Sequence, residues 1–436
     1  MCSFVVYSPS GLRWYIGTKT YFVRQQTRML ILVFNCGSSS LKFDLVEVSS
    51  NSLAHSVNKM ANGTVDRIGS EATIKFSSPE VSYPARKVVA SDHKEAVSRA
   101  LEALAGISGG IEALDAGIRA IGHRVVQGGG LFTEPTLITE GVLSDIEGLN
   151  ELAPLHNPAA VAGIRAALEV FGSDTPNYAV FDTAFHSTLP ERAYTYALPH
   201  ELAEKHRIRR YGFHGTAHEY MLLQYSQARG IPTSEANIIT LQLGNGCSAA
   251  AIKGGRSVDT SMGFTPLEGL VMGTRSGDLD PEIVSYLAEK EGVEVAEVED
   301  WLNKRSGLLG VSGRTSDMRD LLAAMETDAR ARLAVEIFCY RVRKYLGAYM
   351  AVLGGADGVV FGGGIGENAP LIRDRICGDL AWCGLELDAA RNAAVVGEAG
   401  VISSEASRVL VYVVPVDESL LIARHVVERM GGEGVG

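Results

Sequence analysis

The chain of 436 residues lacks three features that would place it in a specialised class of protein. It has six cysteines, too few for a disulfide framework in a chain of this length, and no Cys/His spacing typical of a zinc site. It has no uninterrupted apolar run of about 18 residues, so we expect no membrane span. It also lacks an excess of positive charge. The formal net charge is −11, which argues against nucleic acid as a main partner.

Glycine, by contrast, is abundant, with 48 residues. Three Gly/Ser/Asn-rich turns, at residues 35–40, 244–248 and 362–368, each follow an apolar run directly. A strand that ends in such a turn exposes backbone N–H groups with no side chains in the way, which suits a polyphosphate. The first two turns are alike, since each leads into a second apolar strand. They suggest two lobes that close on a nucleotide, and two ordinary β-hairpins are the alternative.

Strand and helix patterns alternate in both halves of the chain, which predicts α/β lobes with mixed sheets. We predict an N-terminal lobe over residues 29–180 and a C-terminal nucleotide-binding lobe over residues 181–418. A helix over residues 419–430 is expected to pack back on the first lobe. Residues 1–28 carry four basic residues and no acid. We expect them to be a disordered extension or a misassigned start, and the Gly-rich end after residue 430 to fray.

Strand alternation also makes a local prediction. Between residues 41 and 48 it places Leu41, Phe43 and Leu45 on one face, with Lys42 and Asp44 on the other. The basic run at residues 205–210 is expected to be a solvated helix end.

Three arginines, Arg124, Arg275 and Arg319, lie beside Gly or Ser turns. An arginine in such a place suits bidentate binding of a carboxylate or a phosphate. Surface salt bridges are the alternative for each of them.

A carboxylate and an imidazole are further candidates. Asp182 follows the strand predicted over residues 177–181, and the ends of strands are where α/β sites are built, although a helix N-cap also uses aspartate. His214 lies between an aromatic residue and a glycine, where it could donate to a transferring phosphoryl group or be structural. Asn35 and Glu418 could hold a partly hydrated Mg²⁺ ion.

Eight motifs, in order, closely resemble the acetokinase family, and the likeness runs from Met29 to about Val426. They are residues 35–43, 122–129, 153–158, 181–186, 211–216, 243–246, 272–278 and 364–368. The resemblance implies a two-lobed α/β fold of the sugar kinase/Hsp70/actin (ribonuclease H-like) type, with the nucleotide in the cleft between lobes. It implies reversible transfer of the γ-phosphoryl group of ATP to acetate, giving acetyl phosphate and ADP, with Mg²⁺ or Mn²⁺.

The resemblance also implies a role for each matching residue. Asp182 would be the catalytic carboxylate, and His214 and Arg275 would stabilise the transition state. Arg124 would bind the substrate, and Asn35 and Glu418 the metal. The nucleotide contacts would be Lys42, Gln242, Leu243, Gly244, Asn245, Gly246, Asp317, Met318, Arg319, Gly364, Ile365, Gly366, Glu367 and Asn368. The apolar pocket for the acetate methyl group would be Val126, Leu155, Phe213 and Pro266.

The chain departs from the family pattern in four places. Gln242 replaces a common histidine before the second turn, and an amide cannot carry the charge of an imidazolium. Gln127 also replaces a frequent histidine, and Ser419 stands where a second acid is common, which leaves one carboxylate for the metal. Cys36 and Cys247 occupy two phosphate turns. They are either small buried residues or thiols whose modification blocks ATP binding.

Two other functions stay open at this point. The first is a propionate or butyrate kinase of the same family, because one methylene is worth only about 1–3 kcal/mol of discrimination. The second is a non-catalytic ATP-binding module of the actin/Hsp70 type, which the fold alone would permit. The resemblance further implies a cytoplasmic homodimer whose small-molecule partners are ATP/ADP and acetate/acetyl phosphate, with neither nucleic acid nor membrane as a partner.

Overall fold

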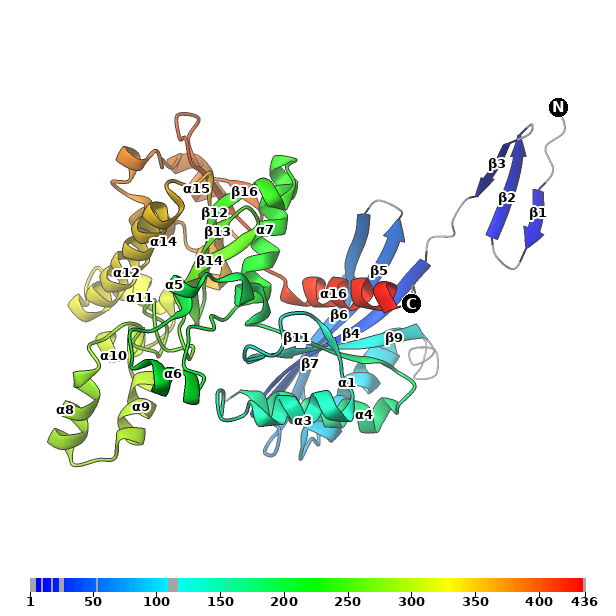
Figure 1. Ribbon diagram of the computed structural model, residues 1–436, viewed down its shortest axis with the longest axis horizontal. Helices are drawn as coiled ribbons and strands as arrows, with labels where there is room; N and C mark the ends of the chain where they lie inside the picture. The colour runs from blue at the N-terminus through cyan, green and yellow to red at the C-terminus, as the bar shows by residue number, and fades with distance from the viewer. Residues whose placement is uncertain are drawn as a thin grey trace.

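The computed structural model describes residues 5–8, 11–16, 19–22, 27–51, 54–108, 117–154 and 156–433. These residues form three sheets, drawn in Figure 1. The smallest has the antiparallel order β1-β2-β3, with strands Val5–Ser8, Gly11–Ile16 and Lys19–Phe22. These strands lie in the segment predicted to be a disordered extension or a misassigned start. The nature of that segment stays a prediction.

The second sheet has eight strands in the order β10-β11-β9-β4-β5-β6-β7-β8. They are β4 (Thr27–Gly37), β5 (Ser40–Asn51), β6 (Ala54–Asp66), β7 (Thr73–Ser77), β8 (Ser82–Lys87), β9 (Ile118–Val125), β10 (Thr136–Leu137) and β11 (Asn177–Phe181). The alternation predicted in β5 is confirmed, because Leu41, Phe43 and Leu45 are buried together in one core cluster and Lys42 is exposed.

Helices cover both faces of this sheet. Leu32 and Phe34 of β4 pack in the cluster that contains α1 (His93–Ser108) and residues of α4 (Asn157–Phe171). The neighbouring residues Ile31 and Val33 pack instead against α16 (Glu418–Glu433). A strand buried on both faces needs a continuous apolar run, which explains why residues 31–34 do not alternate with polar ones.

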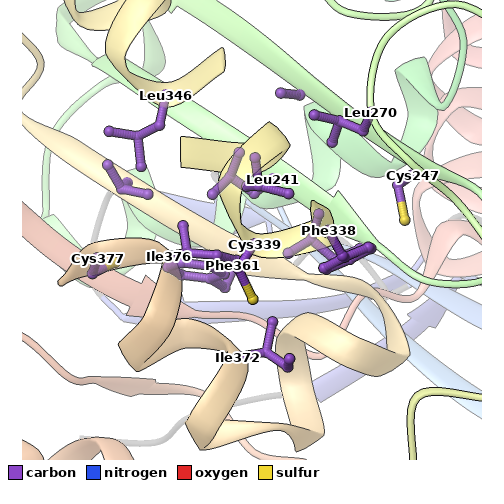
Figure 2. Packing of buried hydrophobic residues seen from close by; sticks show 14 of the residues in the cluster. Leu241, Cys247, Leu270, Phe338, Cys339, Leu346, Phe361, Ile372, Ile376 and Cys377 are labelled. Carbon is purple, nitrogen blue, oxygen red and sulfur yellow. The ribbon is translucent and has the colours of Figure 1, made fainter. Parts of the chain in front are cut away.

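The third sheet has six strands in the order β14-β13-β12-β15-β17-β16. They are β12 (Asn237–Leu243), β13 (Cys247–Lys253), β14 (Arg256–Thr260), β15 (Gly358–Gly362), β16 (Gly400–Val401) and β17 (Leu410–Val413). The long helix α12 (Ala329–Leu353) packs on one face, and α7 (Gly215–Arg229) packs on the other. Figure 2 shows Phe338 and Leu346 of α12 beside Leu241 and Phe361 of the strands.

The remaining helices are shorter and connect these layers. They are α3 (Glu140–Gly148), α5 (Glu191–Tyr194), α6 (His200–Lys205), α8 (Glu282–Glu291), α9 (Val295–Lys304), α10 (Gly307–Ser312), α11 (Met318–Ala324), α13 (Gly363–Asn368), α14 (Pro370–Cys377) and α15 (Ala389–Ala394), with 3-10 turns η1 (Ala184–Thr188), η2 (Thr233–Glu235) and η3 (Ala381–Cys383). None of the helices in the described part of the chain has the length and hydropathy that a membrane crossing needs.

Each of the two similar turns connects the two strands of a hairpin, and the two hairpins hold equivalent positions in the two large sheets. β4 pairs antiparallel with β5 and parallel with β9, and β12 pairs antiparallel with β13 and parallel with β15. The prediction of mixed sheets is therefore confirmed. The turns are hairpins as well, but each hairpin is built into the centre of a large sheet. The boundary between lobes at residues 180 and 181 stays a prediction.

The C-terminal helix α16 crosses from one sheet to the other. It follows β17 of the six-stranded sheet in sequence and packs on β4, β5, β6 and β9 of the eight-stranded sheet, beside which Figure 1 shows it in red. It continues to Glu433, three residues past the predicted end at residue 430, and residues 434–436 lie outside the described residues. Its His425 is bonded through Nε2 to Glu219 of α7 at 3.1 Å, and its Nδ1 lies 3.6 Å from Glu428. This ionic cluster connects the helices of the two lobes.

We expect this cluster to make stability depend on pH. Glu219 and Glu428 raise the pKa of His425 to about 9 against the opposing effect of burial, from an ordinary value near 6.5. The stabilisation is then complete below about pH 6.5 and is lost as the pH rises through 9. Urea unfolding should show a loss of about 3 kcal/mol across this window. The His425→Gln variant should lack this decline, and equal slopes in both proteins would refute the assignment.

The prediction that residues 205–210 end a solvated helix is wrong for Arg210. Its Nη2 forms an ion pair with Glu268 at 2.5 Å, and its Nη1 donates to the carbonyl oxygens of Thr260, Ser261 and Met262. A planar guanidinium has several donors in a rigid geometry, so one arginine can hold three consecutive backbone carbonyl groups in place.

Candidate active site

An ion pair at the end of the eight-stranded sheet forms the centre of the candidate site. Arg124 lies near the end of β9 and Asp182 directly after the parallel neighbour β11. Nε and Nη2 of Arg124 donate to the two carboxylate oxygens of Asp182 at 2.8 and 2.5 Å. Asp182 is 1% exposed, so this is a buried bidentate pair. It is neither a surface salt bridge nor a helix N-cap.

Three other oxygen-bearing side chains surround this pair. Glu418, the first residue of α16, lies 3.0 Å from Nε of Arg124, and the amide oxygen of Asn35 accepts from Nη1 at 3.5 Å. The hydroxyl of Thr216, in the first turn of α7, donates to Glu418 at 2.8 Å. Residues from β4, β9, β11, α7 and α16 therefore meet at one point, although they are far apart in the sequence.

The charges of this cluster depend on one another. Burial raises the pKa of Asp182 to about 6, although Arg124 favours its charged form. Burial also opposes the charge of Glu418, but Arg124 outweighs it and lowers the pKa of that carboxylate. Burial disfavours the Arg124 cation as well, and the two acids still raise its pKa. The guanidinium thus holds two carboxylates together that would otherwise repel each other.

The donor set fits the predicted metal. The amide oxygen of Asn35 and the carboxylate of Glu418 both contact the guanidinium of Arg124, so they lie close together. Hard oxygen ligands of this kind suit Mg²⁺. Within the described residues, no group of three or more His, Cys, Asp or Glu residues could hold a metal ion by itself. A site made of two protein oxygens is consistent with an ion that takes its remaining ligands from phosphates and water.

His214 lies at the N-cap of α7 in the left-handed backbone conformation, with a φ of 57°. Burial lowers its pKa to about 4, with Arg124 and Arg275 adding to the decrease, so the ring is neutral at pH 7. A Cβ atom on Gly246 would lie 3.4 Å from its Nε2 and 3.6 Å from Nη1 of Arg275. The second turn therefore lies within ordinary contact distance of both side chains.

Arg275 lines a cavity of about 370 Å³ between the two lobes. One wall contains Pro154 and His156, and the other contains Pro266, whose carbonyl oxygen accepts from Arg275 at 3.3 Å. Burial lowers the pKa of the Arg275 guanidinium, a sign that it lies in a poorly solvated place. A small apolar wall beside a desolvated cation suits a short carboxylic acid.

The predicted residues of the acyl pocket are only partly brought together. Pro266 lines the cavity. Phe213 is 1% exposed in the main core cluster, and Val126 packs against the same cluster. Leu155 lies outside the described residues.

A second cavity, of about 650 Å³, collects most of the predicted nucleotide contacts. Its lining includes Gly244, Asn245, Asp317, Met318, Arg319, Gly364, Ile365 and Asn368. The volume is in the range of ligand sites. Arg319 is 89% exposed and pairs with Asp317, so its guanidinium forms a surface salt bridge at the rim of this cavity.

Other predicted nucleotide residues are not among those that line this cavity. Leu243 is completely buried in the core, and Gly366 is buried as well. The carboxylate of Glu367 accepts from the backbone N–H of Val416 at 3.0 Å, away from the cavity. Gln242 has a buried Oε1 with no hydrogen-bond partner.

Lys42 does not line this cavity but lies in β5 of the eight-stranded sheet. It is paired across the β4–β5 hairpin with Asn35, which places it on the side of the metal ligands.

Sequence reasoning missed three residues of the site. His156 lies close enough to Arg275 and Arg124 for both to lower its pKa, together with burial. Thr216 bonds the metal carboxylate, and Ser248 bonds His214 at 2.8 Å. His156 and Thr216 lay inside motifs that resemble the family. The bond of Ser248 to His214 could not be found from the sequence, because 34 residues separate them.

The thiols of Cys36 and Cys247 should not react while the protein is folded. Burial raises the pKa of both to about 12, although the surface exposure of Cys36 makes it only half-buried, and only a thiolate is an effective nucleophile. Cys247 belongs to the core cluster drawn in Figure 2, and a Cβ on Gly163 would collide with the sulfur of Cys36. Iodoacetamide at neutral pH should therefore leave ATP turnover intact.

Mass spectrometry of the alkylated protein tests this expectation, with denatured protein as the control in which every cysteine reacts. Loss of turnover that follows labelling of either thiol would instead support the hypothesis that they guard the nucleotide.

Comparisons with known proteins agree with this geometry. The model of the acetokinase family matches residues 30–424. The acetate kinase of Solibacter usitatus is 51% identical over 415 residues, covering 93% of this chain and 99% of the relative. The crystal structure of Porphyromonas gingivalis acetate kinase matches with a TM-score of 0.84 and 40% identity, covering 91% of this chain and 98% of that one. A propionate kinase from Francisella tularensis matches with a TM-score of 0.83, also at 40% identity and with the same coverage.

Two mixed sheets with a nucleotide-sized cavity and a buried Arg–carboxylate cluster define a two-lobed kinase of the actin/Hsp70 type, as predicted. The chain belongs to the acetokinase family.

Proposed function

We propose that the protein transfers the γ-phosphoryl group of ATP reversibly to acetate, giving acetyl phosphate and ADP. The observation that carries this proposal is the position of Gly246. Its turn belongs to the segment that lines the nucleotide cavity, and its missing Cβ would meet both His214 and Arg275. A polyphosphate in that cavity would thus end beside an arginine that also lines the cavity suited to a short acid.

The chemistry asks mainly for positioning and charge neutralisation. Acetate is already an anion and needs no strong base, so Asp182 would act chiefly by orienting Arg124. Its carboxylate accepts hydrogen bonds from Nε and Nη2 of that guanidinium. Nη1, which lies beside Asn35, would then be the donor for an oxygen of the substrate. Arg124 and Arg275 would offset the repulsion between acetate and the γ-phosphate.

The neutral ring of His214 can donate one hydrogen bond to the transferring group. Asn35 and Glu418 would hold Mg²⁺, or Mn²⁺, which supplies further neutralisation of phosphate charge when bound.

A hydroxamate assay tests the proposal. Purified protein is incubated with Mg-ATP and hydroxylamine while acetate, propionate and butyrate are titrated in turn. We expect acyl hydroxamate with the highest kcat/KM for acetate. ATP binding without acyl hydroxamate from any acid would overturn the kinase proposal in favour of a nucleotide-binding module. ADP release that does not depend on acetate would have the same consequence.

A propionate kinase is the second candidate, favoured by the similarity to the Francisella enzyme. The cavity of about 370 Å³ also admits longer acids, so discrimination rests on contacts with its wall. A higher kcat/KM for propionate in the same assay would select this candidate.

We also propose a cytoplasmic homodimer, on the strength of the family resemblance. Sedimentation equilibrium of the purified protein tests the dimer, and cell fractionation tests the compartment.

A further inference from the structure

His214 ends a chain of hydrogen bonds that runs into the core of the C-terminal lobe. Its Nδ1 lies 2.8 Å from the hydroxyl of Ser248, and the same hydroxyl lies 2.8 Å from Nε2 of His218. Nδ1 of His218 lies 2.7 Å from the hydroxyl of Thr240. Ser248, His218 and Thr240 are all completely buried, so water does not complete their hydrogen bonds.

A serine hydroxyl has a single proton, so it can donate to only one of its two histidine neighbours and must accept from the other. Burial lowers the pKa of both His214 and His218, so each ring is neutral at pH 7 and carries one N–H. The bonds must therefore all point the same way along the chain. In one direction Nε2 of His214 carries the proton at the site. In the other direction Nε2 is a bare acceptor.

The inner end of the chain favours the first direction. There, Thr240 donates to His218, His218 donates to Ser248, and Ser248 donates to His214, so every proton has an acceptor. In the opposite direction, the hydroxyl of Thr240 accepts from His218, and its own proton has no acceptor. Among the described residues, that hydroxyl has no hydrogen-bond partner other than His218. An unsatisfied donor in a completely buried place is unfavourable.

A phosphoryl group at the outer end favours the same direction. The Nε2 edge of His214 faces Gly246 and Arg275, where the phosphoryl group would lie. Oxygens of a phosphoryl group are acceptors, so they would be repelled by a bare nitrogen and bound by an N–H.

We propose that Thr240, His218 and Ser248 form a positioning relay that keeps Nδ1 of His214 an acceptor and presents its Nε2–H to the transferring phosphoryl group. This inference deepens the proposed function and rests on it, because it takes His214 as a group that faces the phosphoryl. The three relay residues do not touch the substrate. They act through the tautomer and the orientation of one ring.

The chain contains a matched control in the same region. Nδ1 of His186 lies 2.8 Å from the hydroxyl of Ser257, which is also completely buried, and Nε2 of His186 bonds the carbonyl oxygen of Phe213 at 3.0 Å. The Ser257→Ala variant therefore removes the same kind of serine–histidine bond from the same kind of environment without breaking the relay.

The first measurement is the tautomer of His214 in the wild-type protein. NMR of protein labelled with ¹⁵N-histidine, with His214 assigned through its absence in His214→Gln, distinguishes a protonated Nε2 from a protonated Nδ1. We expect protons on Nε2 of both His214 and His218. A proton on Nδ1 of His214 overturns the proposal, whether or not any variant folds.

The second measurement is kinetic. Ser248→Ala should lower kcat by about 10- to 100-fold, as loss of an orienting partner does for other functional histidines. The KM values for ATP and acetate should stay within about threefold, and Ser257→Ala should keep the wild-type kcat. Wild-type kcat in Ser248→Ala, or equal losses in both variants, overturns the relay.

The two proposals can fail separately. If the wild-type protein makes no acyl phosphate, the proposed function fails, while the tautomer still decides on the relay.

Discussion

The Arg275→Ala variant should lose about 10²- to 10³-fold in kcat while its dissociation constant for ATP changes by less than about threefold. Arg275 lies beside the Gly246 turn and lines the interlobe cavity, so in the proposed reaction its charge would lie between the two anions. Removal of one preorganised donor of this kind costs about 3–4 kcal/mol of transition-state stabilisation. The selective effect on turnover is expected because the nucleotide cavity is lined by other residues.

Two measurements distinguish a role of Arg275 in phosphoryl transfer from a role in nucleotide binding. Kcat comes from the hydroxamate assay, and ATP affinity from calorimetry in the absence of acetate. The Arg275→Lys variant keeps the charge without the planar fork, so it should recover part of the lost kcat. Equal losses in kcat and ATP affinity for Arg275→Ala would show that the arginine serves nucleotide binding instead.

The Arg124→Leu variant should lose both activity and stability. Without the guanidinium, the carboxylates of Asp182 and Glu418 face each other with side-chain exposures of only 1% and 25%. Breaking a buried pair by removing one partner costs about 3–5 kcal/mol. We expect a decrease of that size in the free energy of unfolding at pH 7, and no measurable acyl hydroxamate.

A second substitution tests the reason for that loss. The double variant Arg124→Leu/Asp182→Asn removes one of the two repelling charges. It should regain part of the stability but none of the activity. The control is Arg165→Leu, which breaks an exposed pair with Glu147 and should cost at most about 1 kcal/mol. If Arg124→Leu costs no more than this control, the buried cluster does not hold its acids in the way described.

Parts of the site that lie on one segment could be predicted from the sequence. The turns at residues 38–39 and 244–246 follow strands, and strand periodicity together with glycine content locates such turns without knowledge of the fold. Asp182 could be placed at the end of a strand for the same reason. The assignment of precise roles depended on the family resemblance, because a single arginine beside glycine is equally consistent with a surface salt bridge. Arg319 forms such a salt bridge, whereas Arg124 does not.

Side-chain direction at the turns was harder to predict. Leu243 and Glu367 belong to segments with the correct position, but the side chain of Leu243 points into the core and that of Glu367 toward the backbone of Val416. A strand alternates its side chains between two faces, so a motif of consecutive residues always contains members that point away from the ligand.

Except at residues 363–368, which form helix α13 in place of the third predicted turn, the sequence by itself determined the local elements: the apolar strands, the glycine turns between them and the amphipathic helices. These depend on interactions between residues close in the chain, which leave a periodic pattern. Tertiary structure decided which distant residues share one environment. Arg124, Asp182 and Glu418 meet only because β9 and β11 are neighbours and α16 returns to their sheet. The pKa values of these groups arise from that shared burial and from the charges it brings together, and no local pattern records either.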